Sequence, residues 1–176
     1  MFLLKYVSPE QATGQLGEIY GVFPKEIGPP RPLQLMSASP GFLSCQFEIM
    51  KYYMNHQKLS FALQTAIRYM AANECDYDYC INFNRTLLMA AGADEQALEA
   101  FKNDPGTAPL EDHESAMLKF VSKAIKTPEA VVPSDLEALR DLGWEDADIL
   151  DATAHGAFMQ GHRTLMKAFS EKPSAG

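Results

Sequence analysis

The residues of this sequence that could carry out chemistry lie closest together in NECDYDYCINFNRTLL, residues 73–88. Two of the three cysteines, Cys75 and Cys80, stand five positions apart there, where an apolar helical pattern begins. Such a pair can cycle between dithiol and disulfide, form one corner of a metal site, or be two buried thiols, because free cysteine is often buried like a small apolar residue. The function of the chain depends on which of these three applies.

Geometry decides whether the two sulfur atoms can meet. Asp76 or Asp78 can cap a helix that contains Cys80, which places Cys80 in the first turn, where backbone N–H groups and the helix dipole favour a thiolate. The same two aspartates oppose this effect, since a like charge raises the pKa of a thiol. Within one helix, residues five apart point about 140° away from each other, whereas a disulfide needs Cα atoms within roughly 7 Å. A bent loop before the helix would bring Cys75 to Cys80, and a straight helix would not.

We expect neither a metal ion nor a cofactor at this pair. Zinc takes four nitrogen or sulfur ligands, or three and a water molecule, and His155 and His162 are the candidates to complete such a site. They are seven residues apart, about 10 Å along a helix, which is far for one ion. We expect them instead to line a helix contact or a pocket. Cys45, between Leu43 and Phe47, is expected in the core.

The elements that must hold these residues are helices along the whole chain. Start signals, each a serine followed by a proline, occur at Ser8-Pro9 and Ser39-Pro40, and apolar residues then recur at helical spacing. Gly92 can close the cysteine-bearing helix in a left-handed C-terminal turn. The prolines of KEIGPPRPLQLM favour a structured loop, and strand signals are almost absent. We predict an all-α bundle of about seven or eight helices.

Length and composition set broader limits. The 176 residues fit one domain, in which we expect an N-terminal helix and proline-rich loop (1–38), a helical core (39–170) and a flexible tail (171–176). The net charge of −8 argues against a nucleic-acid partner, since phosphate binding needs a clustered basic surface. No apolar run reaches the roughly 18 residues that suggest a membrane span. Three unevenly spaced cysteines are untypical of a secreted disulfide framework. We expect a cytoplasmic protein.

The order of several segments resembles one family of helical proteins. LSFALQTAIRYMAANECDYDYCINFN is similar to the Leu-Ser opening, Asn-x-Cys and Tyr-Cys signature of the AhpD-like, or carboxymuconolactone decarboxylase, superfamily. PEQATGQLGEIY and PLQLMSASPGFL before it, and VVPSDLEALRDLGWEDADILDA after it, agree with this likeness. The resemblance covers residues 8–165. It implies an AhpD-like helical bundle that assembles into dimers, trimers or hexamers. Members with complete motifs are thiol peroxidases or disulfide reductases, and others are lactone decarboxylases without the cysteine pair.

The sequence departs from the motif that carries the redox chemistry. Redox members of the superfamily show Glu-x11-Cys-x2-Cys-x3-His, in which glutamate and histidine relay a proton and the cysteines form a reversible disulfide. Cys80 matches the second cysteine, and Asn84 stands where the histidine is expected. Tyr77 occupies the position of the first cysteine, so Cys75 is displaced by two residues.

The positions that should relay protons hold no group that can do so near neutral pH. The glutamate position holds Thr65, or Leu63 if the displaced cysteine sets the count. An asparagine amide can donate a hydrogen bond to a sulfur anion but cannot take a proton, and tyrosines such as Tyr79 have an unperturbed pKa of about 10. A positioned base contributes about 10²–10⁴ in rate, so we expect weak activity. Arg68 could stabilise a thiolate if it pointed inward, but we expect a solvated side chain.

Three functions are consistent with these residues and the resemblance. The first is a thiol oxidoreductase of the alkylhydroperoxidase or disulfide-exchange type, with a small hydroperoxide or disulfide as substrate and Cys75, Cys80, Asn84 and Tyr79 as the candidate catalytic residues. The second is a helical oligomer without peroxidase activity that binds a small apolar ligand, with pocket candidates Tyr79, Phe83 and Phe158. The third is a lyase like carboxymuconolactone decarboxylase, for which no residue set argues.

Overall fold

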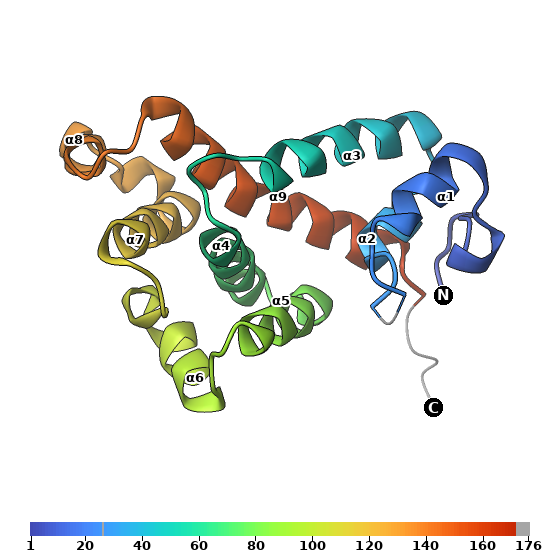
Figure 1. The fold of residues 1–176 in the computed structure, drawn as a ribbon, viewed down its shortest axis with the longest axis horizontal. Coiled ribbons are helices and arrows are strands. Elements are labelled where there is room, and N and C mark those ends of the chain that lie inside the picture. The colour runs from blue at the N-terminus through green and yellow to red at the C-terminus, as the bar shows by residue number, and fades with distance from the viewer. Residues whose placement is uncertain (26, 172–176) are drawn as a thin grey trace. The chain divides into compact units, whose positions relative to one another are not determined.

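The computed structural model, which describes residues 1–25 and 27–171, confirms the all-α prediction (Figure 1). Within these residues there is no β-strand, and the one β-bridge joins Phe2 to Ser170. Three short 3₁₀ turns, each with a proline as its first residue, accompany nine helices. The helices are α1 (Gly14–Gly21), α2 (Arg31–Met36), α3 (Pro40–Met54), α4 (Phe61–Glu74), α5 (Asp78–Ala90), α6 (Glu95–Asn103), α7 (Asp112–Lys126), α8 (Pro133–Asp141) and α9 (Asp146–Phe169).

The chain forms two compact units. The first unit consists of residues 1–55 together with the chain from residue 164 onward, and the second consists of residues 56–163. The long helix α9 therefore contributes its last turns to the first unit and the remainder to the second. The expected divisions at residues 38 and 170 stay predictions, and of the expected tail, residues 172–176 lie outside the described residues.

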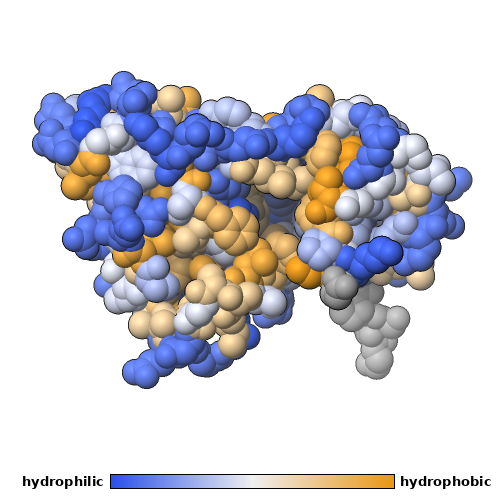
Figure 2. All heavy atoms as spheres, in the orientation of Figure 1, coloured by the Kyte–Doolittle hydropathy of each residue, from blue (hydrophilic) through white to orange (hydrophobic). Residues whose placement is uncertain are grey.

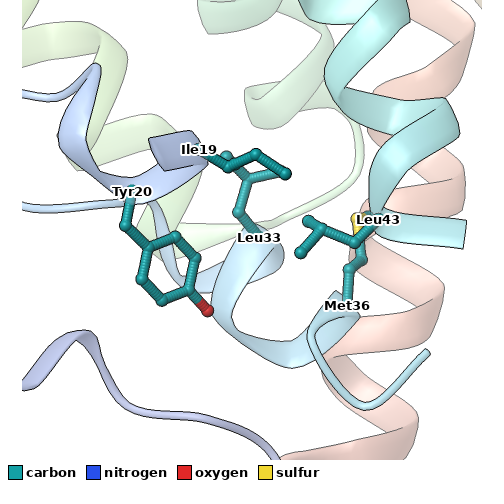
Figure 3. Packing of buried hydrophobic residues seen from close by; sticks show 5 residues of the cluster. All are labelled: Ile19, Tyr20, Leu33, Met36 and Leu43. Atoms are coloured by element: carbon teal, nitrogen blue, oxygen red, sulfur yellow. The ribbon is translucent and has the colours of Figure 1, made fainter. Parts of the chain in front are cut away.

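The first unit is built around a small apolar cluster from α1, α2 and α3. Five buried side chains form it, as Figure 3 shows: Ile19, Tyr20, Leu33, Met36 and Leu43. Partly buried apolar residues of α1, α3 and the end of α9 pack against them. The polar end of Tyr20 is satisfied, since its hydroxyl donates to Val7 O at 3.2 Å. The cluster is thus held by close packing of apolar side chains, with the one hydroxyl at its edge bonded to backbone.

Two local predictions in the first unit need correction. The segment expected to be loop contains helix α2, because Pro32 stands within its first turn, where a missing N–H breaks no helical hydrogen bond. The start signal at Ser8 opens only a 3₁₀ turn (Pro9–Gln11), and α1 begins at Gly14. The Ser8 side chain makes no capping hydrogen bond, so the turn lacks the bond that would continue it as an α-helix.

The second unit is organised around α4, which packs against α5, α6 and α7. α4 begins after a capping serine, where the Ser60 hydroxyl accepts from Leu63 N at 3.0 Å and donates to the buried carboxylate of Glu114. Residues 63–72 of α4 are buried with the single exception of Arg68, which is partly exposed. A helix that is covered on every side is a central element of the fold. The buried N–H groups of the Arg68 guanidinium therefore need hydrogen-bond acceptors inside the protein.

Helix α9 approaches α4 and α7 closely at Gly156. A Cβ atom at this position would lie 2.5 Å from Ile125 Cδ1, 3.1 Å from Val121 Cγ1 and 3.2 Å from Ile67 Cγ2. Only a glycine leaves room for that approach, which brings the neighbouring residue of α9, His155, to the side of α4. At the start of the same helix the chain's one tryptophan, Trp144, is buried and donates from its indole N–H to a backbone carbonyl of α7 at 3.1 Å.

Apolar side chains of the second unit also reach the surface. Figure 2 shows orange atoms of apolar residues among blue ones on the visible face around α6 and α7. The most exposed large apolar residues of this unit are Leu150 (69%) and Phe61 (63%). Among the described residues, no helix combines the length and hydropathy needed to cross a membrane.

Candidate functional site

Cys75 and Cys80 lie at opposite ends of the tight turn that joins α4 to α5. Cys75 is the C-cap residue of α4, and the turn closes as a Schellman motif in which Asp76 adopts φ 47° and Tyr77 N donates to Ala72 O at 3.0 Å. The left-handed position of this motif is usually glycine, but aspartate tolerates it better than most residues. Cys80 is the third residue of α5, in its first turn as predicted.

The predicted caps of this helix are wrong. Tyr77, rather than Asp76 or Asp78, is the N-cap residue of α5, and its side chain makes no capping bond. Asp76 cannot take that role because its left-handed backbone ends the preceding helix, and Asp78 already has a helical position. A single residue therefore separates the left-handed turn from the helix that carries Cys80, and this fixes the direction in which α5 leaves α4.

The two thiols differ in exposure, and Cys75 affects the pKa of Cys80. Cys80 is buried, whereas Cys75 is partly exposed and its thiol donates to Ala72 O at 3.6 Å. Both are free thiols. Burial first, and then the nearby Cys75 thiol, raise the pKa of Cys80 to about 12, against the lowering effects of Arg68 and of a hydrogen bond from Tyr77. The sequence left open whether the helix dipole or the nearby aspartates decide the pKa of this thiol. Burial is the largest effect, and Cys80 is a protonated thiol near neutral pH.

Arg68 occupies the centre of the site, and the expectation that it is solvated is wrong. Its Nε donates to Asn84 Oδ1 at 2.9 Å, and one terminal nitrogen donates to Thr65 Oγ1 at 2.9 Å. Asn84 in turn donates from Nδ2 to Cys80 O at 2.8 Å. Burial lowers the pKa of Arg68 to about 10, and it remains a cation at neutral pH. Thr65 and Asn84, the two residues at the expected relay positions, therefore both bind the same guanidinium.

His155 completes the network from α9. Its Nε2 lies 3.0 Å from the remaining terminal nitrogen of Arg68. A guanidinium can only donate, so Nε2 accepts and the imidazole carries its proton on Nδ1. Burial, and then the charge of Arg68, lower the pKa of His155 to about 3, and burial also lowers the pKa of His162. His155 therefore lines a helix contact as a neutral acceptor, and in the described part of the chain no group of potential ligands could hold a metal ion.

The structure also places the remaining candidate residues of the sequence. Cys45 is exposed rather than in the core, because it is two residues, about 200°, from buried Leu43 around α3. Tyr79 stacks on Phe83, one turn further along α5, with ring centroids 6.1 Å apart. Phe158 is 44% exposed, so it does not close an internal apolar pocket with that pair.

Sequence reasoning missed Arg68 and His155 as members of the site. One signal for Arg68 was present: FALQTAIRYMAANE is apolar on nearly every side, and a charged residue in such a helix has no solvated face to occupy. Thr65, three residues earlier, lies on the same side of that helix and could have suggested the partner. His155 gave no such signal, since it stands 87 positions from Arg68 in sequence.

Comparison with known proteins supports the fold. The sequence matches no protein-family model and no curated protein. The structure is similar to a crystal structure described as an alkylhydroperoxidase AhpD core, an uncharacterized peroxidase-related protein from Ralstonia eutropha, with a TM-score of 0.76, 20% identity, and coverage of 99% of this chain and 93% of that one. It is also similar to an uncharacterized peroxidase-related protein from Silicibacter, with a TM-score of 0.68, 22% identity, and coverage of 81% and 75%. The chain thus has the AhpD-like fold that the sequence suggested.

Proposed function

We propose that the protein is a thiol oxidoreductase in which Cys80 and Cys75 alternate between dithiol and disulfide while a small hydroperoxide is reduced. The observation that carries this proposal is the short Schellman turn between the two cysteines, across which the Cys75 thiol affects the pKa of Cys80. The fold shared with peroxidase-related proteins is consistent with it. Asn84 acts as a positioning residue, since it binds both the Cys80 carbonyl and Arg68.

The proposed reaction needs the two cysteines, the hydroperoxide and an external dithiol as reductant. The Cys80 thiolate attacks the terminal oxygen of the hydroperoxide, the O–O bond breaks, and the leaving alkoxide takes a proton to become the alcohol. Cys75 then attacks the sulfur of the Cys80 sulfenic acid, and a disulfide and water form. A dithiol reductant restores both thiols by exchange and becomes a disulfide itself. Partly exposed Cys75 is the thiol that such a reductant would reach.

Deprotonation of Cys80 is the slow point of this scheme. With a pKa of about 12, roughly one molecule in 10⁵ carries the thiolate at pH 7. His155 cannot serve as the base, because its free electron pair faces Arg68 and its pKa is about 3. The cation of Arg68 and the hydrogen bond from Tyr77 favour the thiolate, but burial outweighs them. The proposed activity is therefore slow at neutral pH and increases in alkaline solution.

Mass spectrometry of the intact protein tests the proposal. After treatment with cumene hydroperoxide, the wild-type protein is expected to lose two hydrogen atoms as the disulfide forms, and Cys80→Ser is expected to prevent that loss. Cys75→Ser should instead leave Cys80 with one added oxygen, because no second thiol resolves the sulfenic acid. Cys45→Ser is the matched control and should behave as the wild type. Three unmodified thiols after excess hydroperoxide would rule out this function.

We also infer that the protein self-associates through the second unit. Phe61, Leu150 and Phe158 are large apolar residues that are between 44% and 69% exposed, and contact between copies would remove them from water. Light scattering should give a mass at least twice that of the 19.5 kDa chain, and Leu150→Glu should reduce it. A wild-type mass of one chain at micromolar concentration would contradict the inference.

A further inference from the structure

Arg68 carries a positive charge that its contacts do not neutralise. Its three hydrogen-bond partners are Thr65, Asn84 and His155, none of which is a carboxylate. Among the described residues, Cys80 is the one group of opposite charge that affects the pKa of Arg68, and it is protonated near neutral pH. The resting site therefore holds an uncompensated cation, which is costly in a partly buried place.

Two other arginines of the second unit, Arg85 and Arg140, have carboxylate partners. Arg85 of α5 forms an ion pair with Glu95, and Arg140 of α8 forms one with Asp146 at 2.7 Å. Both of these pairs lie at the surface, where the charges are also solvated. The exposed arginines Arg85 and Arg140 thus have carboxylate partners, although solvent could stabilise their charges. The partly buried Arg68 has hydrogen bonds to neutral groups instead.

The neutral partners are themselves held so that only an acceptor faces Arg68. The Asn84 amide donates to Cys80 O, which turns its oxygen toward the guanidinium. The Thr65 hydroxyl donates to Phe61 O at 2.7 Å and so offers a lone pair. A guanidinium has five N–H groups, and these contacts use one on each nitrogen. One N–H on each terminal nitrogen remains for a further acceptor.

We propose that Arg68 is the binding point for a carboxylate group of the substrate, so that the hydroperoxide or disulfide reduced at Cys80 is that of an organic acid. This rests on the proposed function for the identity of the reacting group but not for the binding itself. A carboxylate can accept hydrogen bonds from both terminal nitrogens of one guanidinium. Because the guanidinium is already fixed by three hydrogen bonds and is partly buried, the anion meets a preorganised partner.

The surroundings favour a singly charged organic acid over inorganic phosphate. One cation matches one negative charge, and the neighbouring residues Thr65, Asn84 and His155 are neutral, whereas a phosphate dianion would leave excess charge in a partly buried site. Arg68 is partly exposed, so solvent reaches part of the side chain. Tyr79 and Phe83 stack about 100° around α5 from Cys80 and Asn84, and provide apolar surface beside the site.

Calorimetric titration of the full chain with hexanoate tests the proposal. We expect saturable binding at pH 7.5 that is absent for hexanol and weaker by at least tenfold in Arg68→Gln. Arg68→Lys keeps the charge without the two-point geometry and should bind with intermediate affinity. Stronger binding of inorganic phosphate than of hexanoate would overturn the assignment of a carboxylate.

A second variant keeps the test decisive if Arg68→Gln does not fold. Asn84→Asp places a carboxylate next to Arg68 Nε, supplies the missing negative charge from within the chain, and should abolish hexanoate binding in a folded protein. Failure of hexanoate to bind the wild type, or equal binding to Asn84→Asp, would overturn the proposal.

The same titration separates this site from the redox function. Cys80→Ser should still bind hexanoate, since the sulfur is no part of the carboxylate contact. In a peroxidase assay, the ratio of kcat/KM for a fatty-acid hydroperoxide to that for cumene hydroperoxide should fall at least tenfold in Arg68→Lys. Hexanoate binding without any peroxidase activity would rule out the proposed function but not the carboxylate site. An unchanged ratio of the two kcat/KM values in Arg68→Lys would rule out the organic-acid substrate but not the peroxidase function.

Discussion

Different interactions occur in the interiors of the two units: packing of apolar side chains in the first, and a hydrogen-bonded cation in the second. The centre of the first unit is an apolar cluster in which shape and volume decide the fit. The second unit also buries apolar residues of α4 and α7, but within it Arg68 is a cation whose fit depends on matched acceptors, namely Thr65, Asn84 and His155. An apolar centre tolerates exchanges that keep volume, whereas a polar one tolerates exchanges that keep hydrogen bonds. Substitutions should therefore obey different rules in the two units.

The largest expected effect on stability lies in the apolar cluster. Leu43 is 2% exposed, and Leu43→Ala should lower the free energy of unfolding by about 2–5 kcal/mol, because it removes buried apolar surface and leaves a cavity. Leu43→Met keeps the volume and should cost less than about 1.5 kcal/mol. Urea denaturation monitored by circular dichroism measures both. Equal losses for the two variants would show that packing volume does not decide stability there.

The chemistry of the second unit should depend strongly on pH. Because burial raises the pKa of Cys80 to about 12, its thiolate fraction and its rate of alkylation by iodoacetamide should increase about tenfold per pH unit between pH 7 and 9. Peptide mass spectrometry can track Cys80 and exposed Cys45 in the same sample. If Cys80 were labelled as fast as Cys45 at pH 7, burial would neither shield the Cys80 thiol nor raise its pKa.

The close approach of α9 gives a third test, with a control in the same helix. Gly156→Ala places a methyl group 2.5 Å from Ile125 Cδ1 and should destabilise the protein by about 1–3 kcal/mol through overpacking. Gly161→Ala meets no atom within 4 Å and should be neutral or stabilising by up to about 1 kcal/mol. Thermal unfolding compares the two variants. A neutral Gly156→Ala would mean that α9 can move away from α4 without cost.

The last test concerns the neutral histidine, whose effect develops only in acid solution. The pKa of His155 falls from 6.5 to about 3 on folding, so below pH 6.5 the unfolded chain binds a proton that the folded chain does not. Its contribution to stability is complete above pH 6.5 and decreases toward pH 3, by at most about 1.4 kcal/mol per pH unit. His155→Gln, which keeps an acceptor, should flatten the dependence measured by urea denaturation. An identical slope would place the titrating group elsewhere.

Local signals in the sequence predicted most of the helices. Gly92, with φ 103°, comes after the end of α5 as expected, because left-handed turns depend on residues close in sequence. Ser8 failed as a helix start because its side chain makes no capping hydrogen bond, and only a 3₁₀ turn follows it. Asp76 was not foreseen in a left-handed turn because glycine usually takes that position.

The site was predictable only in part. The cysteines and Asn84 were identified from local spacing and resemblance, but the inward direction of Arg68 depends on α5 and α9, which supply its acceptors. Residues distant in sequence come together only through tertiary packing, and the contact of His155 requires the glycine directly after it, Gly156. Cys45 was expected in the core but is exposed. The sequence of an apolar helix does not show which of its sides other helices will cover.

The single tryptophan lets the unfolding of the second unit be followed separately from that of the whole chain. Trp144 belongs to the second unit, so tryptophan fluorescence reports on that unit alone, whereas far-ultraviolet circular dichroism reports on helices of both. Melting curves from the two signals coincide if the units unfold together and diverge if they unfold separately. Loss of the indole hydrogen bond to the His113 carbonyl would shift the emission toward the red as soon as α7 and the start of α9 part.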